Sequence, residues 1–221
     1  MSRTYTCYLA TLIGLFCVAF IIYVAFFAQT RTVRNDVIQG FLIGFGLAFA
    51  TAQAYARIKA VKTNGWITMY EFGKPGNGMF LRAAQVQIFT GPVNSQEEAM
   101  YWWTEVDGAG RTLSGQHHYV MHFPAGQLPP NDAFWSITMG DAKNHFVANP
   151  LNRYCVNDRT GLVQNTDGSV DVYIQKTVPT GHESNWLPAP TGNFILWLRV
   201  YMPGQAILDG KYTVPPVVKT K

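Results

Sequence analysis

The segment LNRYCVNDRTG, residues 151–161, brings charged and reactive side chains together in a chain that is only 14% charged. Asp158 stands beside Arg159, and Arg153 precedes Asp158 by five residues. A carboxylate clamped by a bidentate arginine can act as the general base of a hydrolase-type enzyme. The alternative is a loop pinned by Asn and Asp turn hydrogen bonds, with the arginines paired to carboxylates at a sheet edge. Because the sequence shows no partner nucleophile nearby, we favour the structural alternative and keep the three residues as catalytic candidates.

Aromatic residues give a second set of candidates, for ligand binding. In the segment FILWLRVYM, alternate positions hold Trp197, Arg199 and Tyr201. A strand places alternate residues on one face, so these three side chains form a cation–π ladder. Together with Trp186, the ladder can line an aromatic cleft for a sugar or an aromatic ligand. It can equally pack beneath the NWLPAP loop that contains Trp186, and we favour this packing.

The histidines and the cysteine favour structural roles. His117, His118 and His122 fall within six residues of an expected strand. On one face of a strand, His118 and His122 lie about 13 Å apart, which is too far for one metal with His–N bonds of about 2 Å. None of the serines stands in a G-x-S-x-G turn, and Cys155 is more typical of a partly buried thiol than of a nucleophile. We therefore expect no metal and no cofactor.

The first 62 residues have the composition of a membrane anchor. Residues 5–28 carry no charge and exceed the roughly 20 residues needed to span a bilayer. They are also too long for the roughly 7–15-residue apolar region of a signal peptide. Residues 37–56 form a second uncharged segment, in which Gly40 and Gly44 have the GxxxG spacing that lets another helix approach closely. The sequence predicts a hairpin of two spans joined by QTRTVRND, with an interfacial helix as the alternative for the second segment.

Charge is divided unevenly along the chain. Residues 1–62 hold six basic groups and one acid, a net charge of +5, whereas residues 63–221 hold eleven basic and twelve acidic groups, a net charge of −1. A nucleic-acid-binding protein carries its basic excess on the folded domain, so nucleic acid is not an expected partner. With two spans, four basic residues flank one side and two flank the other, which favours cytoplasmic termini.

From residue 63 onward the hydrophobic pattern changes to period two, with clusters of Gly, Pro, Asn and Asp between the apolar runs. This pattern predicts an all-β domain over residues 63–221, a sandwich or a jelly-roll-like barrel. The expected strands cover residues 117–123, 134–139, 145–148, 170–175 and 194–202. One short helix is expected over residues 94–102, where Glu97 and Glu98 stand near its start.

Long motifs of this domain resemble a known family. In chain order they are NGWITMYEFGKPGNGMFLRAA, EEAMYWWTEVDGAGRTLSG, YVMHFPAGQLPPNDAFWSITM, VANPLNRYCVNDRTG, NTDGSVDVYIQ, ESNWLPAPTGNFILWLRVYMP and ILDGKYTVPPV. From about residue 64 to 221, the chain resembles the domain-of-unknown-function 1214 family. The resemblance implies an all-β domain of unsettled activity. Many members carry a 1254-family domain where this chain has its apolar segments, and members are often exported, which opposes the orientation that the charges favour.

Two functions follow from these observations. The first is a membrane-anchored β-domain that binds a small ligand or a partner protein, as an accessory subunit of a membrane complex in the bacterial inner membrane. Its partners would be membrane lipid and either a membrane protein or a second copy, contacted through residues 37–56. The alternative is a hydrolase that uses Asp158 with Arg153 or Arg159 in an aromatic cleft. We favour the first function, because the sequence contains no complete catalytic constellation.

Overall fold

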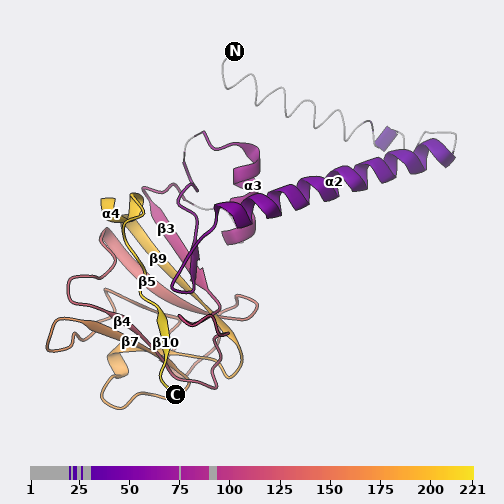
Figure 1. Ribbon diagram of the computed structural model, residues 1–221. Coiled ribbons are helices and arrows are strands. Elements are labelled where there is room, and N and C mark those ends of the chain that lie inside the picture. Colours follow the sequence, from indigo (N-terminus) through magenta and orange to yellow (C-terminus); the bar gives the residue numbers. More distant parts are fainter. Residues whose placement is uncertain (1–19, 21, 24–25, 27–30, 75, 90–93) are drawn as a thin grey trace. The chain divides into compact units, whose positions relative to one another are not determined.

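The computed structural model describes residues 20, 22–23, 26, 31–74, 76–89 and 94–221 (Figure 1). These residues belong to two compact units, residues 1–54 and 55–221. The first unit contains most of helix α2, Arg31–Lys59, and the second contains a mostly β domain. The predicted helix of residues 5–28 lies outside the described residues, except for four helical positions, Phe20, Ile22, Tyr23 and Phe26.

Helix α2 includes the whole predicted segment 37–56 and begins earlier than expected. Residues 31–36 were expected in a hairpin linker, but they are helical, because they contain neither Gly nor Pro to end the helix. Thr32–Lys59 is long and apolar enough to cross a membrane, and it is the one such helix in the described part of the chain. Its large apolar side chains over residues 38–49 are exposed, with Phe41 at 49% and Leu47 at 64%.

The β domain has two sheets, one of six strands and one of four (Figure 1). The six-stranded sheet has the order β1 (Val61–Thr63), β2 (Trp66–Thr68), β3 (Ala99–Thr104), β9 (Phe194–Pro203), β5 (Asn131–Asp141) and β6 (Cys155–Asn157). The four-stranded sheet has the order β10 (Val217–Lys219), β4 (Tyr119–Phe123), β7 (Val170–Gln175) and β8 (Trp186–Pro188). All described pairs are antiparallel except β7 with β8.

The core lies between the two sheets and follows from the alternation of apolar residues along the strands. Phe123 of β4 meets Trp135 of β5 with ring centroids 5.4 Å apart, and Tyr119 meets Phe194 at 5.8 Å. The buried positions of β9 on this inner face include Leu198. Each fully buried aromatic or aliphatic side chain stabilises the fold by about 1.5–3 kcal/mol. The sequence-based expectation of a β-sheet domain is therefore confirmed at the level of two packed sheets.

Helices also belong to this domain, so it is mostly β rather than purely β. Helix α3, Met79–Phe89, contributes Leu81 and Ala84 to the core, and helix α4, Gln205–Leu208, contributes Ile207. A 3₁₀ turn, η1, covers Glu183–Asn185 directly before β8. Three to four consecutive apolar residues in a short run do not distinguish a helix from a strand, which is why α3 was not predicted.

Two local predictions are wrong. Residues 94–102 were expected to be helical, but only a turn forms at Ser95, and β3 starts at Ala99, which pairs with Tyr201 of β9. Residues 145–148 were expected to form a strand, but they lie in a loop. The Oδ1 atom of Asp141 accepts hydrogen bonds from the backbone N–H groups of Lys143 and His145, which closes a turn there. Tertiary pairing and turn chemistry override the local pattern in both places.

The four-stranded sheet positions the candidate site on the face opposite the core. His122 of β4 lies directly opposite Asp171 of β7, and Tyr173 of β7 lies opposite Trp186 of β8. Their neighbours along the strands, such as Val172, point into the core. The outer face of this sheet is therefore polar and aromatic, and the loops around it determine what can reach it.

Candidate functional site

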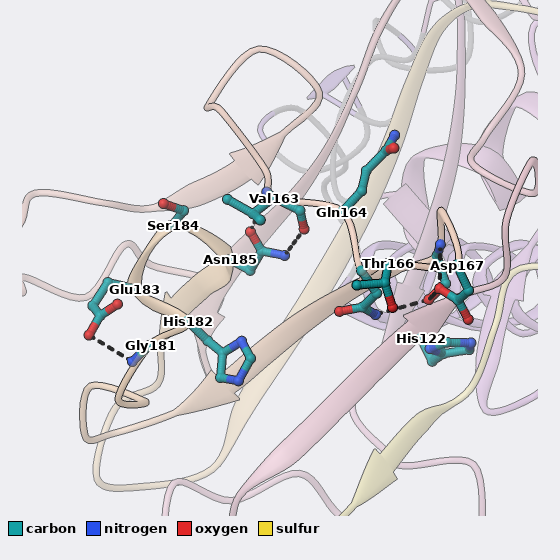
Figure 2. Close-up of a pocket in the computed structure, with 12 residues that line it drawn as sticks. His122, Val163, Gln164, Thr166, Asp167, Gly181, His182, Glu183, Ser184 and Asn185 are labelled. Atoms are coloured by element: carbon teal, nitrogen blue, oxygen red, sulfur yellow. Dashed lines mark hydrogen bonds between the residues drawn. The ribbon is translucent and has the colours of Figure 1, made fainter.

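A cleft of about 630 Å³ lies over the outer face of the four-stranded sheet (Figure 2). Two loops form its walls: residues 163–169, which lead into β7, and residues 181–185, which lead into β8. His122 adds a side chain from β4. Figure 2 shows Glu183 and His182 toward one end, and Asp167 and His122 toward the other.

A hydrogen-bond network fixes the position of His122. Its Nδ1 atom lies 2.6 Å from Oδ1 of Asp171, and the Nδ2 group of Asn165 donates to the other carboxylate oxygen, Oδ2, at 2.9 Å. The buried Asn185 donates from Nδ2 to the backbone carbonyl of Asp171 at 2.8 Å. Because an ionised carboxylate only accepts hydrogen bonds, Nδ1–H of His122 is the donor to Asp171, and in the neutral imidazole Nε2 is then the acceptor.

The two walls are held by their own hydrogen bonds. Asn185 accepts from the backbone N–H of Val163 at 2.7 Å and donates to its carbonyl at 2.8 Å, so one side chain joins both loops. Asp167 accepts from the hydroxyl and the backbone N–H of Ser169. The ring of His182 packs on Tyr173, with centroids 4.5 Å apart. The lining side chains are therefore largely preorganised.

The cleft has an anionic character. The hydrogen bond from the Ser169 hydroxyl, with that from its backbone N–H, lowers the pKa of Asp167. Hydrogen bonds from the backbone N–H groups of Glu183 itself and of Gly181 lower the pKa of Glu183. Both carboxylates are ionised at neutral pH, and among the described residues that line the cleft none is Lys or Arg. Ligands without negative charge are therefore favoured.

The structure does not bring Arg153, Asp158 and Arg159 together. The NH1 group of Arg153 donates to the backbone carbonyls of Glu183, at 2.7 Å, and Trp186, at 2.9 Å. Arg159 donates to the carbonyl of Ala133, and Asp158 is exposed in the turn after β6. In the described part of the chain, neither arginine forms an ion pair with a carboxylate, contrary to expectation. The catalytic assignment of Asp158 stays a prediction.

Asparagine turns do pin this segment, as the sequence indicated. Oδ1 of Asn149 accepts from the backbone N–H groups of Leu151 and Arg153, and Oδ1 of Asn157 accepts from that of Arg159. These bonds hold the backbone from which the Arg153 side chain extends to the carbonyls at η1 and β8. The segment thus borders the cleft through one arginine, although it does not line it.

The predicted aromatic ladder lies on a different surface. Trp197, Arg199 and Tyr201 share the outer face of the six-stranded sheet, where the Arg199 guanidinium lies 5.4 Å from the Trp197 ring centroid. Tyr201 stacks on Phe134 at 4.4 Å. Trp186 is buried in the four-stranded sheet, and its Nε1 group donates to the carbonyl of Gln175. The expectation that the ladder packs beneath the NWLPAP loop is therefore wrong, because that loop belongs to the opposite sheet. Ligand binding by these residues stays a prediction.

Comparison with protein families gives one match. Residues 98–205 match the model of a family described as a protein of unknown function, DUF1214. This segment is similar to the DUF1214 family. All of the cleft residues fall within the DUF1214 segment, as do Arg153 and the ladder. The resemblance inferred from the sequence motifs is therefore confirmed for this part of the chain.

Two solved structures that are similar to the chain are those of longer proteins. A crystallised protein from Vibrio parahaemolyticus is 30% identical, with a TM-score of 0.54, over 62% of this chain and 34% of that one. An uncharacterised protein from Burkholderia cenocepacia is 12% identical, with a TM-score of 0.39, over 87% of this chain and 43% of that one. The chain thus spans less than half of either protein. No curated protein matches it.

The cleft over the outer face of the four-stranded sheet, lined by His122 and residues 163–169 and 181–185, is called the DUF1214 cleft below. Sequence reasoning missed the residues that converge there. His122 and His182 were weighed as metal ligands, with solvated strand histidines as the favoured alternative, and Asp171 and Asn165 were not considered. Asp171 is 49 positions from His122, and only the pairing of β4 with β7 makes them neighbours. The available signal was the alternation in HHYVMHF, which put His122 on the outer face. Among the described residues, no group of three or more His, Cys, Asp or Glu side chains can hold a metal ion.

Proposed function

We propose that the chain is a membrane-anchored binding protein whose β domain takes a small polar ligand in the DUF1214 cleft. The convergence of two histidines and two carboxylates on one cleft of about 630 Å³ carries this proposal. Cavities of this size, with a few positioned polar groups, are typical of small-molecule sites. Because hydrogen bonds already fix His122, Asp167 and Asn185, the ligand would have few side chains to immobilise, which favours affinity.

Calorimetry on the full chain in mild detergent tests this proposal. The probes are choline, glucose and inorganic phosphate, and we expect the first two to bind and phosphate to be rejected by the carboxylates. His182→Ala should weaken binding about tenfold, which corresponds to about 1.4 kcal/mol. The matched control is His145→Ala, because His145 is exposed and outside the cleft. Failure of all three probes to bind, or unchanged binding in His182→Ala, would refute the proposal.

The anchor part of the proposal is supported by the length and exposure of α2. The candidate span within α2, Thr32–Lys59, has 28 residues. At ~1.5 Å per residue it is about 42 Å long, which exceeds a hydrocarbon core of about 30 Å. With residues 5–28 as a second helix, the chain would cross a bacterial inner membrane twice. Fractionation of lysed cells should find the chain in the membrane pellet, released by detergent but not by high salt. Its presence in the supernatant without detergent would contradict the anchor.

A role as an accessory subunit is a second candidate. Among the described residues, nothing lies within 4 Å of the positions where Gly40 and Gly44 of α2 would carry a Cβ atom. Such an open surface permits close approach of another helix, from a membrane protein or a second copy. Purification in mild detergent, with bound partners identified by mass, should recover a complex. Replacing Gly40 by Leu should release the partner, and a lone monomer from the unmodified chain would argue against this role.

A further inference from the structure

We propose that the DUF1214 cleft hydrolyses an ester of a cationic alcohol, with His122 as the general base and Asp171 as its positioning residue. This inference rests on the proposed function, because it places the reaction in the same cleft. It uses a group of residues distinct from the Asp158 segment. It goes beyond binding, because it assigns a reaction and a class of substrate to that cleft.

The geometry around His122 differs from that of an ordinary surface ion pair. The chain contains a second His–Asp pair, His145 with Asp141, for comparison. In that pair the nitrogen and oxygen are 3.7 Å apart, and the histidine side chain is 72% exposed. The His122–Asp171 contact is 2.6 Å, and the Asp171 carboxylate is only 20% exposed. In the His122–Asp171 pair, the side chain of Asn165 also donates to the second oxygen of the Asp171 carboxylate.

This arrangement matches the requirements for general base catalysis. A carboxylate that accepts a hydrogen bond from Nδ1–H keeps the imidazole in one tautomer and stabilises the imidazolium that forms during the reaction. Nε2 of His122 is then the atom that can take a proton at the cleft, where the side chain is 53% exposed. One carboxylate oxygen of Asp171 contacts His122 and the other accepts a hydrogen bond from Asn165. Asp171 therefore positions the base without contacting the substrate.

The reaction can be written with water as the nucleophile. Nε2 of His122 removes a proton from water, and the water oxygen forms a bond to the ester carbonyl carbon, whose π electrons move to the carbonyl oxygen. When the tetrahedral intermediate collapses, the bond from carbon to the alcohol oxygen breaks. The alcohol oxygen takes the proton from the imidazolium, and His122 returns to its neutral form. The products are a carboxylic acid and an alcohol, and no oxidant or other reactant is consumed.

The charge of the cleft selects the substrate. Asp167 and Glu183 lie toward opposite ends of the cleft, as Figure 2 shows, and both are carboxylates. A phosphate ester would be repelled by both, whereas an alcohol that carries a quaternary ammonium group would be attracted. The ring of His182, held on Tyr173, offers a flat surface for the uncharged part of such a molecule. A choline ester combines these properties.

The test measures release of acetic acid from acetylcholine by the full chain in mild detergent, with p-nitrophenyl phosphate as the anionic comparison. We expect hydrolysis of acetylcholine above buffer and none of the phosphate ester. His122→Asn should lower kcat by about 10²–10⁴-fold. Asp171→Asn should lower kcat at least about tenfold with KM changed less than about twofold. His145→Asn, which alters the comparison pair outside the cleft, should keep the wild-type kcat.

Each result decides the inference. Hydrolysis that needs His122 and Asp171 but not His145 supports it. No hydrolysis above buffer, or full activity in His122→Asn, overturns it, and a change in KM alone for Asp171→Asn overturns the positioning role. Calorimetry with choline separates the two proposals: binding without hydrolysis of acetylcholine leaves the binding function standing and removes the catalytic one. If choline, glucose and phosphate all fail to bind, the cleft itself is not a ligand site.

Discussion

Arg153 should contribute more to stability than any other residue of the LNRYCVNDRTG segment that the sequence marked as catalytic. Its NH1 group donates two hydrogen bonds, at 2.7 and 2.9 Å, to the carbonyls of Glu183 and Trp186. A hydrogen bond from a charged donor contributes about 1.5–3 kcal/mol, and the partly exposed position of Arg153 places both bonds near or below the lower end. Arg153→Ala should therefore lower the free energy of unfolding by about 2 kcal/mol.

This loss should be visible as a shift of the melting temperature by about 4–8 °C, given about 2–4 °C per kcal/mol for a domain of this size. The assay is thermal unfolding of the full chain in detergent, followed by tryptophan fluorescence, because Trp186 lies beside the affected bonds. Asp158→Asn is the matched control within the same segment. Its side chain is exposed and has no ion pair or hydrogen bond in the described structure, so its melting temperature should stay within about 1 °C.

Two outcomes would refute this reasoning. If Arg153→Ala had the same melting temperature as the wild type, the carbonyls of Glu183 and Trp186 would be equally well satisfied by hydrogen bonds from water. A large loss of stability in Asp158→Asn would show that this carboxylate has a structural partner. If the protein proves to be an enzyme and Asp158→Asn abolishes activity at unchanged stability, the catalytic prediction for Asp158 would be supported instead.

Two further predictions concern the turn and loop regions of the β domain. Burial alone would raise the pKa of Asp107, but hydrogen bonds from the Arg111 side chain and from backbone N–H groups lower it. The ionised Asp107 carboxylate should contribute its full stabilisation above the unfolded-state pKa of about 3.9, and this contribution should be lost as the pH falls through the lower pKa of the folded state. In urea unfolding at a series of pH values, Asp107→Asn should lack this acid-dependent loss of stability. A Cβ atom on Gly115 would collide with the carbonyl oxygen of Pro190, whereas one on Gly192 would meet nothing within 4 Å. Gly115→Ala should therefore lower the free energy of unfolding by more than about 2 kcal/mol and Gly192→Ala by less than about 1 kcal/mol, and equal losses in calorimetry would contradict this explanation.

The β-sheet architecture was predictable because strands such as β4 and β7 bury alternate residues along most of their length. The predicted strand 170–175 coincides with β7, and 194–202 is one residue shorter than β9. Burial of one face imposes period two on these sequences, so the pattern reports the fold directly. The segment 145–148, HFVA, is a short apolar run, but in the described part of the chain it pairs with no strand, and the hydrogen bonds of Asp141 close a turn there.

The candidate site was much less predictable than the fold. The position of His122 on an outer face follows from alternation, but its neighbour Asp171 depends on which strands pair, and sequence separation gives no information about that. The role of Arg153 was obscured for a related reason. From the sequence, an arginine is expected to pair with a carboxylate. The guanidinium of Arg153 instead donates to two backbone carbonyls that are more than 29 positions away. Contacts between distant backbone groups leave no signature in the sequence.

The same arginine has a consequence for solubility. Strand β8 ends the four-stranded sheet, and a terminal strand of this kind exposes backbone groups on which a strand from another molecule can add. Here the strand has only three residues, Pro188 supplies no N–H donor, and the guanidinium of Arg153 occupies the carbonyl of Trp186. The contact that shapes one wall of the cleft thus also protects the protein from growing into aggregates through its own sheet.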